Sequence, residues 1–218
     1  MKVLVIDTAL NACTAAVFDG DRPLGVRVEP MAKGHQERIG GLVRDAVADA
    51  GGFEGIARIG VTVGPGSFTG LRVGLAFAQG LGAALGVPVV GISTLAGLAR
   101  SADGGAGTTA AVIDARRGQV YLQTFEGGVA TLSPAALGLD AARETLAAAD
   151  RIWAGNGAAL VTDNLAIEPL TVPTPAALAA LTIAADPAEA PPKPLYLRAP
   201  DATPPTRLPG QARPAKPS

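Results

Sequence analysis

The stretch from Gly64 to Gly86 constrains this sequence more than any other. A turn with three glycines and one proline leads into a helix with apolar side chains on all sides. Such a helix must be buried nearly all round, in a core or against a partner. Each glycine inside a helix costs about 1 kcal/mol of helix stability relative to alanine. We therefore expect the glycines to permit close approach of another helix. A core helix packed within one domain would explain the pattern equally well. The ridge of small residues recurs every four positions and consists of Gly70, Gly74, Ala78, Gly82 and Gly86.

The turn can be compared with three kinds of turn that bind nucleotides or carry a nucleophile. A dinucleotide-binding turn needs an acid about 20 residues further on, at the end of the next strand, and the next apolar run, Pro88 to Ile92, carries none. A P-loop needs Gly-Lys-Ser/Thr, whereas Leu-Arg follows the last glycine of this turn. A nucleophilic Ser67 would lack the flanking glycines of a nucleophile elbow, and His35 is the one histidine that could serve as its base. Ser67 is therefore predicted to cap the helix.

Composition excludes several classes of protein. The 218 residues carry a formal net charge of −1, which argues against an autonomous nucleic-acid-binding domain. One cysteine and one histidine cannot provide a disulfide or a zinc site. No signal peptide opens the chain, and Arg72, Gln79 and small residues interrupt the apolar helix. We expect a soluble cytoplasmic protein without a membrane partner.

The order of predicted elements indicates an α/β fold. Three short apolar runs form a meander, and helices then alternate with two more strands. This β-β-β-α-β-α-β-α order is that of a ribonuclease H-like lobe, two of which build sugar kinases, actin and heat-shock ATPases. The predicted elements are strands Val3–Ile6, Cys13–Phe18, Leu24–Val28, Arg58–Val63 and Pro88–Ile92, with helices His35–Ala50, Thr69–Gly86 and Ser93–Ala102.

A second, reduced lobe is predicted after the first. The run Ala110 to Asp114 repeats the pattern of Val3 to Asp7, and a second strand follows each. We therefore expect a first lobe over residues 1–103 and a reduced lobe over 104–190, with a helix near 175–185. Residues 191–218 form a proline-rich basic tail that is expected to be partly disordered. Leu195–Leu197 could pack back as an extended segment, and after Pro200 we expect disorder and an inert, solvated tail.

Six segments, in order, resemble the TsaB (YeaZ) family of tRNA-modification subunits. The block at 64–81 is the most specific, and residues 126–190 match poorly. The segments are LVIDTALNACTAAVFD near the start, GHQERI at 34–39, GPGSFTGLRVGLAFAQGL at 64–81, VPVVGISTL at 87–95, IDARRGQVY at 113–121 and PLYLR at 194–198.

The resemblance implies a dimerisation subunit with no catalytic residues of its own. Such proteins bind and activate TsaD, which with the ATPase TsaE transfers a threonylcarbamoyl group to the tRNA adenosine next to the anticodon. No tightly bound cofactor is expected, because ATP and magnesium belong to the partner subunits. The chain would meet tRNA only through the complex.

The family's dimer surface is made by the first two helices of the first lobe, here the helices predicted at 35–50 and 69–86. That location agrees with the ridge of small residues, and a homodimer would compete for the same face. The implied partner-binding residues are His35, Arg38, Ile39, Leu42, Val43, Gly70, Leu71, Arg72, Gly74, Leu75, Ala78 and Gly82.

The resemblance also implies that an ancestral site has been lost. TsaD-like proteins carry two metal-binding histidines on a helix, whereas here Ile39 stands one turn after His35, so no metal site is expected and His35 is assigned to the surface or an interface. Asp7 with Thr8, and Asp114, match acids that organise magnesium and phosphate in ATP-binding relatives. They are weak cofactor candidates, since an acid that caps a turn explains them as well.

Two other functions stay open at this point. The chain could be an ATP-dependent enzyme of the actin-like fold, with Asp7 and Asp114 organising magnesium. It could also be a glycoprotease-like peptidase, which would require Ser67 and His35 to meet.

Overall fold

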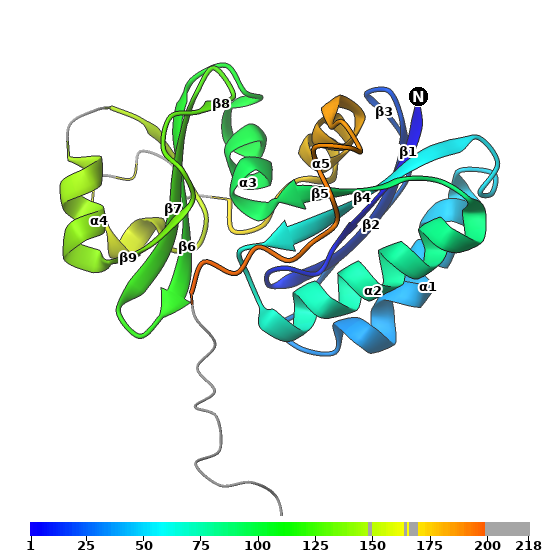
Figure 1. The fold of residues 1–218 in the computed structure, drawn as a ribbon, viewed down its shortest axis with the longest axis horizontal. Coiled ribbons are helices and arrows are strands. Elements are labelled where there is room, and N and C mark those ends of the chain that lie inside the picture. Colours follow the sequence, from blue (N-terminus) through cyan, green and yellow to red (C-terminus); the bar gives the residue numbers. More distant parts are fainter. Residues whose placement is uncertain (148–149, 164, 166–169, 199–218) are drawn as a thin grey trace, which may run out of the picture.

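Two β-sheets, each with its own helices, lie side by side along the long axis of the molecule (Figure 1). The computed structural model describes residues 1–147, 150–163, 165 and 170–198. The first sheet has the strand order β3-β2-β1-β4-β5, in which β1 is antiparallel to β2 and parallel to β4. This is the meander with parallel crossovers that the sequence predicts. Its strands are β1 (Lys2–Asp7), β2 (Ala12–Asp19), β3 (Arg22–Pro30), β4 (Ile56–Gly64) and β5 (Val89–Ser93).

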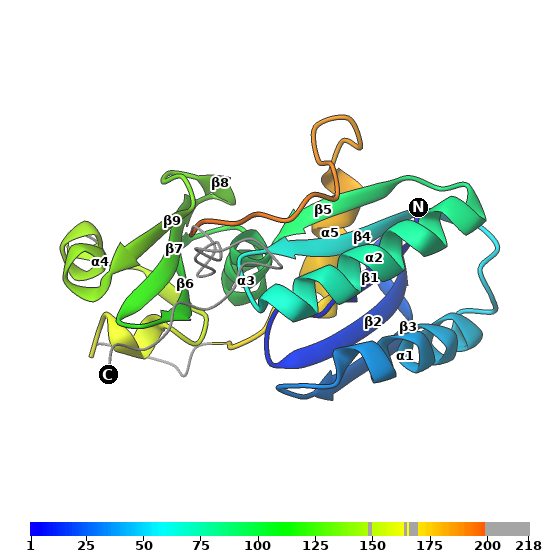
Figure 2. The same ribbon diagram turned by 60° about the horizontal axis from the view of Figure 1, so that its bottom comes forward.

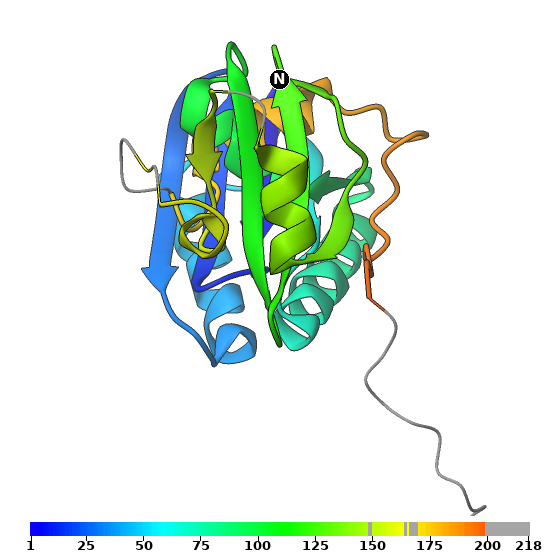
Figure 3. The same cartoon turned by 90° about the vertical axis from the view of Figure 1, so that its left-hand side faces the viewer.

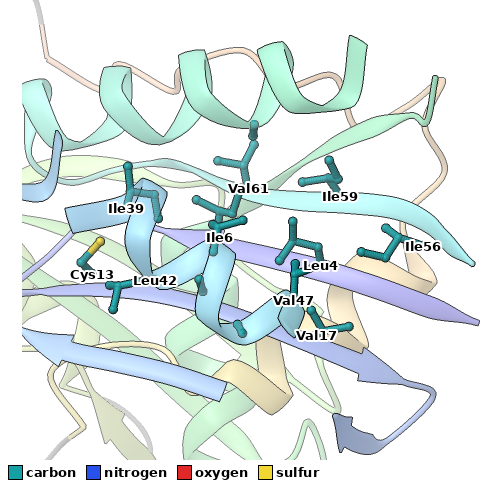
Figure 4. Close-up of a cluster of buried hydrophobic side chains, with 14 of the residues drawn as sticks. Leu4, Ile6, Cys13, Val17, Ile39, Leu42, Val47, Ile56, Ile59 and Val61 are labelled. Atoms are coloured by element: carbon teal, nitrogen blue, oxygen red, sulfur yellow. The ribbon is translucent and has the colours of Figure 1, made fainter. Parts of the chain in front are cut away.

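Helices α1 (His35–Asp49) and α2 (Phe68–Leu85) cover one face of the first sheet (Figure 2). Between α1 and the sheet lies a core of aliphatic side chains, which includes Leu4, Ile39 and Ile59 (Figure 4). The central strands β1 and β4 are buried on both faces for most of their length, as expected for strands with helices on either side.

Helix α5 (Pro175–Ala184) covers the opposite face of the first sheet, where Leu178 packs with Val3 and Val5. The prediction that a helix near 175–185 belongs to the second lobe is therefore wrong. The physical reason is that α5 is almost uniformly apolar and must be buried. The side of β1 that faces away from α1 and α2 is also apolar, so α5 packs there. The approach is close, since a Cβ on Gly60 would lie 1.8 Å from Thr182 Oγ1.

The second sheet repeats the pairing of the first in shorter form. Strand β6 is antiparallel to β7 and parallel to β10, as β1 is to β2 and β4. Helix α4 (Leu139–Leu146) lies on its outer face (Figure 3), and α3 (Thr94–Asp103) lies between the two sheets. The strands are β6 (Thr108–Arg116), β7 (Gln119–Glu126), β8 (Val129–Ala130), β9 (Ala135–Gly138) and β10 (Ile152–Ala154), followed by a 3-10 turn at Ala158–Leu160.

Residues 190–198, which we call the strap, run from α5 back along β5 and α2 to the second sheet (Figure 1). The backbone N–H of Leu195 donates to Val63 O at 2.8 Å, and that of Gly91 to Ala190 O at 2.9 Å. A guanidinium N–H of Arg198 donates to Ala115 O at 3.0 Å. The extended segment at 195–197 thus packs back on the first sheet, as the sequence allowed, and the expectation of disorder after Pro200 falls on residues 199–218, which lie outside the described part.

Cys13 provides a test of the first core, because its thiol is buried and burial raises its pKa to about 11. The thiolate is the reactive form of cysteine. We expect an aromatic disulfide reagent at mildly alkaline pH to label the native chain at least about 100-fold more slowly than the urea-unfolded chain. Comparable labelling rates in the two states would contradict this core.

Candidate functional site

The acid that ends β1 is enclosed by its own chain. The carboxylate of Asp7 is 1% exposed, and its Oδ1 accepts hydrogen bonds from the Ala9 N–H at 2.8 Å and the Thr62 hydroxyl at 2.7 Å. Burial raises the pKa of Asp7, although both hydrogen bonds and the neighbouring His35 act to lower it. The neighbouring Thr8 hydroxyl donates to Gly70 O at 2.7 Å. Both side chains therefore join β1 to the elements around it.

The glycine-rich turn between β4 and α2 closes the space beside this acid. The Ser67 N–H donates to Ala9 O at 2.7 Å, so the turn lies directly on the connection between β1 and β2. A Cβ on Gly66 would lie 2.4 Å from Ala9 O, and one on Gly70 would lie 2.1 Å from Thr8 O. The backbones of the turn and of the β1–β2 connection are thus in direct contact beside Asp7, whose carboxylate is buried and already accepts two hydrogen bonds. This arrangement does not fit a magnesium–nucleotide site at Asp7.

Asp114 lies two residues before the end of β6 and has partners of its own in the second sheet. Its Oδ1 accepts from the Arg116 N–H at 2.7 Å, and its own N–H donates to Asn156 Oδ1 at 3.0 Å. The Gly155–Gly157 turn therefore closes onto the end of β6. Within the described ranges, no three His, Cys, Asp or Glu side chains are grouped so that they could hold a metal ion.

Replacing Asp7 with asparagine tests whether the carboxylate is structural. Because the pKa of Asp7 is raised in the folded chain, the folded state binds the proton more tightly, and stability falls as pH rises above the ordinary aspartate value. Asp7→Asn keeps the Oδ1 acceptor, so we expect its free energy of unfolding at neutral pH to match or exceed the wild-type value within about 1 kcal/mol.

Urea unfolding between about pH 4 and pH 7 provides the measurement, and the wild-type chain should lose stability relative to Asp7→Asn across that range. A variant that is strongly destabilised at neutral pH would show that the negative charge is required.

The peptidase alternative needs Ser67 and His35 to meet, and each is engaged separately. The Ser67 hydroxyl accepts from the Gly70 N–H at 3.2 Å, which confirms the predicted helix cap. His35 is 7% exposed, and its Nε2 lies 3.2 Å from Leu10 O. No hydrogen bond joins the two side chains in the described part of the chain. His35 was expected at the surface or at an interface. It is buried in the single chain, because α1 begins beneath the connection between β1 and β2, and a role at an interface stays a prediction.

The ridge of small residues on α2 faces the first sheet. A Cβ on Gly74 would lie 2.4 Å from Thr8 Oγ1, and one on Gly82 would lie 2.4 Å from Val89 Cγ2. The expectation that this ridge docks a partner is therefore wrong, because the small residues bring α2 close to its own sheet. The buried positions of α2 are Gly70, Leu71, Gly74, Leu75, Ala78 and Gly82, all of which were assigned to partner binding.

Helix α1 shows the same division between a buried and an exposed side. Its buried positions include Ile39, Leu42 and Val43, so their assignment to direct partner contact is also wrong for the single chain. Arg38 is exposed, and its guanidinium binds both carboxylate oxygens of Glu29, at 3.0 and 2.6 Å. Arg72 is likewise exposed. Partner binding by Arg38 and Arg72 stays a prediction.

Helices α1 and α2 lie side by side on the first sheet (Figure 2), and we call the side of the two helices that points away from the sheet the outer face. A Cβ on either Gly41 or Gly80 would meet no atom within 4 Å, so both positions are open. The resemblance placed a partner surface on these two helices, but most of the residues named for it are the buried ones. The exposed side carries a second series of small residues at 76, 80 and 84, with the same four-residue spacing as the inward ridge. Its residues are Gly40, Gly41, Arg44 and Ala48 of α1, and Val73, Ala76, Phe77, Gly80, Ala83 and Ala84 of α2.

Comparison with known families and proteins gives a consistent result. Residues 19–182 match the family described as "TsaD: tRNA N6-adenosine threonylcarbamoyltransferase". An uncharacterised protein of Mycobacterium tuberculosis is 39% identical over 207 residues, which cover 93% of this chain and 94% of that protein. The Escherichia coli protein named tRNA threonylcarbamoyladenosine biosynthesis protein TsaB is 37% identical over 129 residues, 58% of this chain and 55% of that protein.

The fold is similar to that of a solved structure of YeaZ from Pseudomonas aeruginosa. The two superpose with a TM-score of 0.76 at 30% identity, over 90% of this chain and 99% of that one. The α/β fold predicted from the order of elements is therefore shared with that protein along nearly its whole length.

Proposed function

The chain belongs to the TsaB (YeaZ) family, and we propose that it is a non-catalytic subunit that binds and activates a TsaD-type transferase. Two similar proteins, from Escherichia coli and Bacillus subtilis, are named tRNA threonylcarbamoyladenosine biosynthesis protein TsaB. In this role the chain, with TsaD and the ATPase TsaE, supports transfer of the threonylcarbamoyl group to the adenosine next to the anticodon. ATP and magnesium belong to the partner subunits.

The observation that carries this proposal is the outer face. Helices α1 and α2 have 15 and 18 residues, so they are about 22 and 27 Å long. A face of that length is sufficient for a standard interface, which buries about 800 Å² on each partner. Its exposed glycines and alanines allow two helices of a partner to approach closely. A second copy of this chain would compete for the same surface.

The enclosed end of β1 supports a role without chemistry. Asp7 and Thr8 are committed to hydrogen bonds within the chain, and the glycine-rich turn packs directly on the connection that follows β1. A subunit of this kind activates by binding the competent conformation of its partner more tightly than the incompetent one. Docking free energy at the outer face would then be used to hold TsaD in that conformation.

The proposed setting is the cytoplasm, where the complex would act on tRNA. By length and composition alone α2 is able to cross a membrane, since its 18 residues have a mean hydropathy of 1.2. In the folded chain its inner side packs on the first sheet, as a core helix does. We therefore assign the inner side of α2 to the core and its outer side to partner binding, and we expect no membrane partner.

Reconstitution tests the proposal directly. Purified TsaD, TsaE and tRNA are supplied with the threonylcarbamoyl donor, and formation of the modified adenosine is followed with and without this chain. We expect modification to depend on the chain, and the chain alone to hydrolyse neither ATP nor peptides. Equal rates with and without the chain, or turnover by the chain alone, would contradict the proposal.

A further inference from the structure

Two exposed aromatic rings meet an arginine at the first turn of α2. Phe68 is 54% exposed and Tyr196 of the strap is 48% exposed, and their ring centroids are 5.7 Å apart. The Arg72 guanidinium carbon lies 3.8 Å from the Phe68 centroid, and its Nε donates to the Tyr196 hydroxyl at 3.3 Å. These contacts hold both rings in place at the surface, each with nearly half or more of its area in solvent.

Two more arginines occupy the tip of the hairpin between β6 and β7. Arg116 and Arg117 have φ angles of 64° and 55°, in the left-handed region that favours glycine, asparagine or aspartate. Arginine adopts this region only at a cost in stability, and such costs persist mainly at functional sites. The Arg116 side chain is 80% exposed and lies 3.3 Å from Asp114. The hairpin therefore presents two cations at a place where smaller residues would be more stable.

The strap brings these two groups together (Figure 1). Arg198 donates to Ala115 O at 3.0 Å and lies 3.4 Å from Gln119 Oε1, at the base of the hairpin tip. Two residues of extended chain span at most about 7 Å, so Tyr196 lies within that distance of Arg198. We call Phe68, Arg72, Arg116, Arg117, Tyr196 and Arg198 the arginine–aromatic patch.

The charge of the patch differs from that of the whole chain. Overall, 18 lysines and arginines are balanced by 19 acids, whereas the patch contains four arginines beside Asp114. The sequence after the strap, residues 199–218, adds Arg207, Arg213 and Lys216 against Asp201. Among the described residues, the four arginines of the patch therefore concentrate positive charge where the strap meets the second sheet.

We propose that the arginine–aromatic patch binds a single-stranded segment of RNA. Exposed rings stack on unpaired bases, and guanidiniums bind phosphates and also stack on bases. The inference rests on the proposed function, in which the modified adenosine lies in an unpaired tRNA loop. An RNA strand satisfies rings and cations together, whereas a protein partner would have to bring a matching set of carboxylates. The chain would then contact tRNA itself, beyond its role as a scaffold for TsaD.

Two double variants separate stacking from charge. In the assembled complex, affinity for an anticodon stem-loop RNA is measured by fluorescence anisotropy at two salt concentrations. Phe68→Ala with Tyr196→Ala should weaken RNA binding by about 10-fold. Arg116→Gly with Arg117→Gly should lower the slope of log affinity against log salt by about one to two. The glycine variant should melt at the wild-type temperature or higher, because glycine adopts positive φ without strain.

Matched controls lie far from the patch. Arg22→Ala removes an exposed cation near the N-terminus, and Phe53→Ala removes an aromatic ring that is 39% exposed. Neither should change RNA affinity or its salt dependence. RNA affinity that is equal in both double variants and the wild type would overturn the inference.

The affinity of each variant for the partner subunits, measured without RNA, distinguishes this inference from the proposed function. If the double variants lose partner affinity and RNA affinity falls only as a consequence, the patch is a protein contact and the inference is overturned, while the proposed function stands. If the wild-type chain fails to join the complex, the proposed function fails. In that case the RNA affinity of the isolated wild-type chain and of the isolated variants is measured. The inference is overturned if the wild-type chain does not bind the RNA, or if the variants bind it as tightly as the wild type.

Discussion

A chain with Gly80→Arg is expected to fold normally and to lose its partner. Gly80 lies on the outer face in the interior of α2, and a Cβ there meets no atom within 4 Å. Replacing a glycine inside a helix removes a penalty of up to about 1 kcal/mol, so stability should be equal or higher. In a close contact between helices the new guanidinium would be buried without a counter-charge, which costs about 3 kcal/mol or more. Affinity for TsaD should therefore fall by at least about 100-fold.

Isothermal titration of TsaD with the two chains, together with thermal unfolding of each, measures both parts of this result. Ala141→Arg adds the same side chain at an exposed position of α4, outside the outer face. It should leave TsaD affinity unchanged. If Gly80→Arg binds TsaD as tightly as the wild type, docking takes place elsewhere on the molecule.

Gly74→Leu is expected to destabilise the fold, whereas Gly80→Arg is expected to leave the fold stable and weaken partner binding. Gly74 faces the first sheet, where a Cβ would lie 2.4 Å from Thr8 Oγ1 and 3.6 Å from Val61 Cγ2. The Thr8 hydroxyl is fixed by its bond to Gly70 O, so it cannot move aside without breaking that bond. Overpacking of a tight core typically costs 1–3 kcal/mol and sometimes more. A leucine here should reach about 3 kcal/mol, which corresponds to a fall in Tm of about 6–12 °C for a chain of this size.

Gly80→Leu in the same helix is the matched control, because it adds the same atoms on the exposed side. Urea unfolding should show Gly80→Leu to be at least as stable as the wild type. Equal stabilities for the two leucine variants would mean that the inward ridge is not packed as the structure shows.

The two glycines also show what the sequence could and could not predict. The four-residue spacing of small residues correctly indicated that α2 makes a close contact. It could not indicate which side of α2 makes it, because the series at 70, 74, 78 and 82 and the series at 76, 80 and 84 lie on opposite sides. The deciding neighbour is Thr8, 62 residues away from Gly70 in the chain. Local spacing carries no information about such a contact.

The order of strands in the first sheet was predictable, because a meander followed by crossovers permits few arrangements. The placement of α5 was not, since its residues follow the second sheet in sequence and return to the first in space. The left-handed conformations of Arg116 and Arg117 could not be foreseen either. Their positions resemble an ordinary polar hairpin turn, in which Gly118 alone signals positive φ.

The strap has a mechanical consequence for any assembly that contains this chain. Leu195 bonds the strap to β4 and Arg198 bonds it to Ala115 near the end of β6, so the strap joins the two sheets in addition to their shared core around α3. Hinge motion between the sheets would have to break these bonds and separate that core. We therefore expect the two sheets to move as one rigid unit, so that in the proposed complex any opening or closing would occur in the partner subunits.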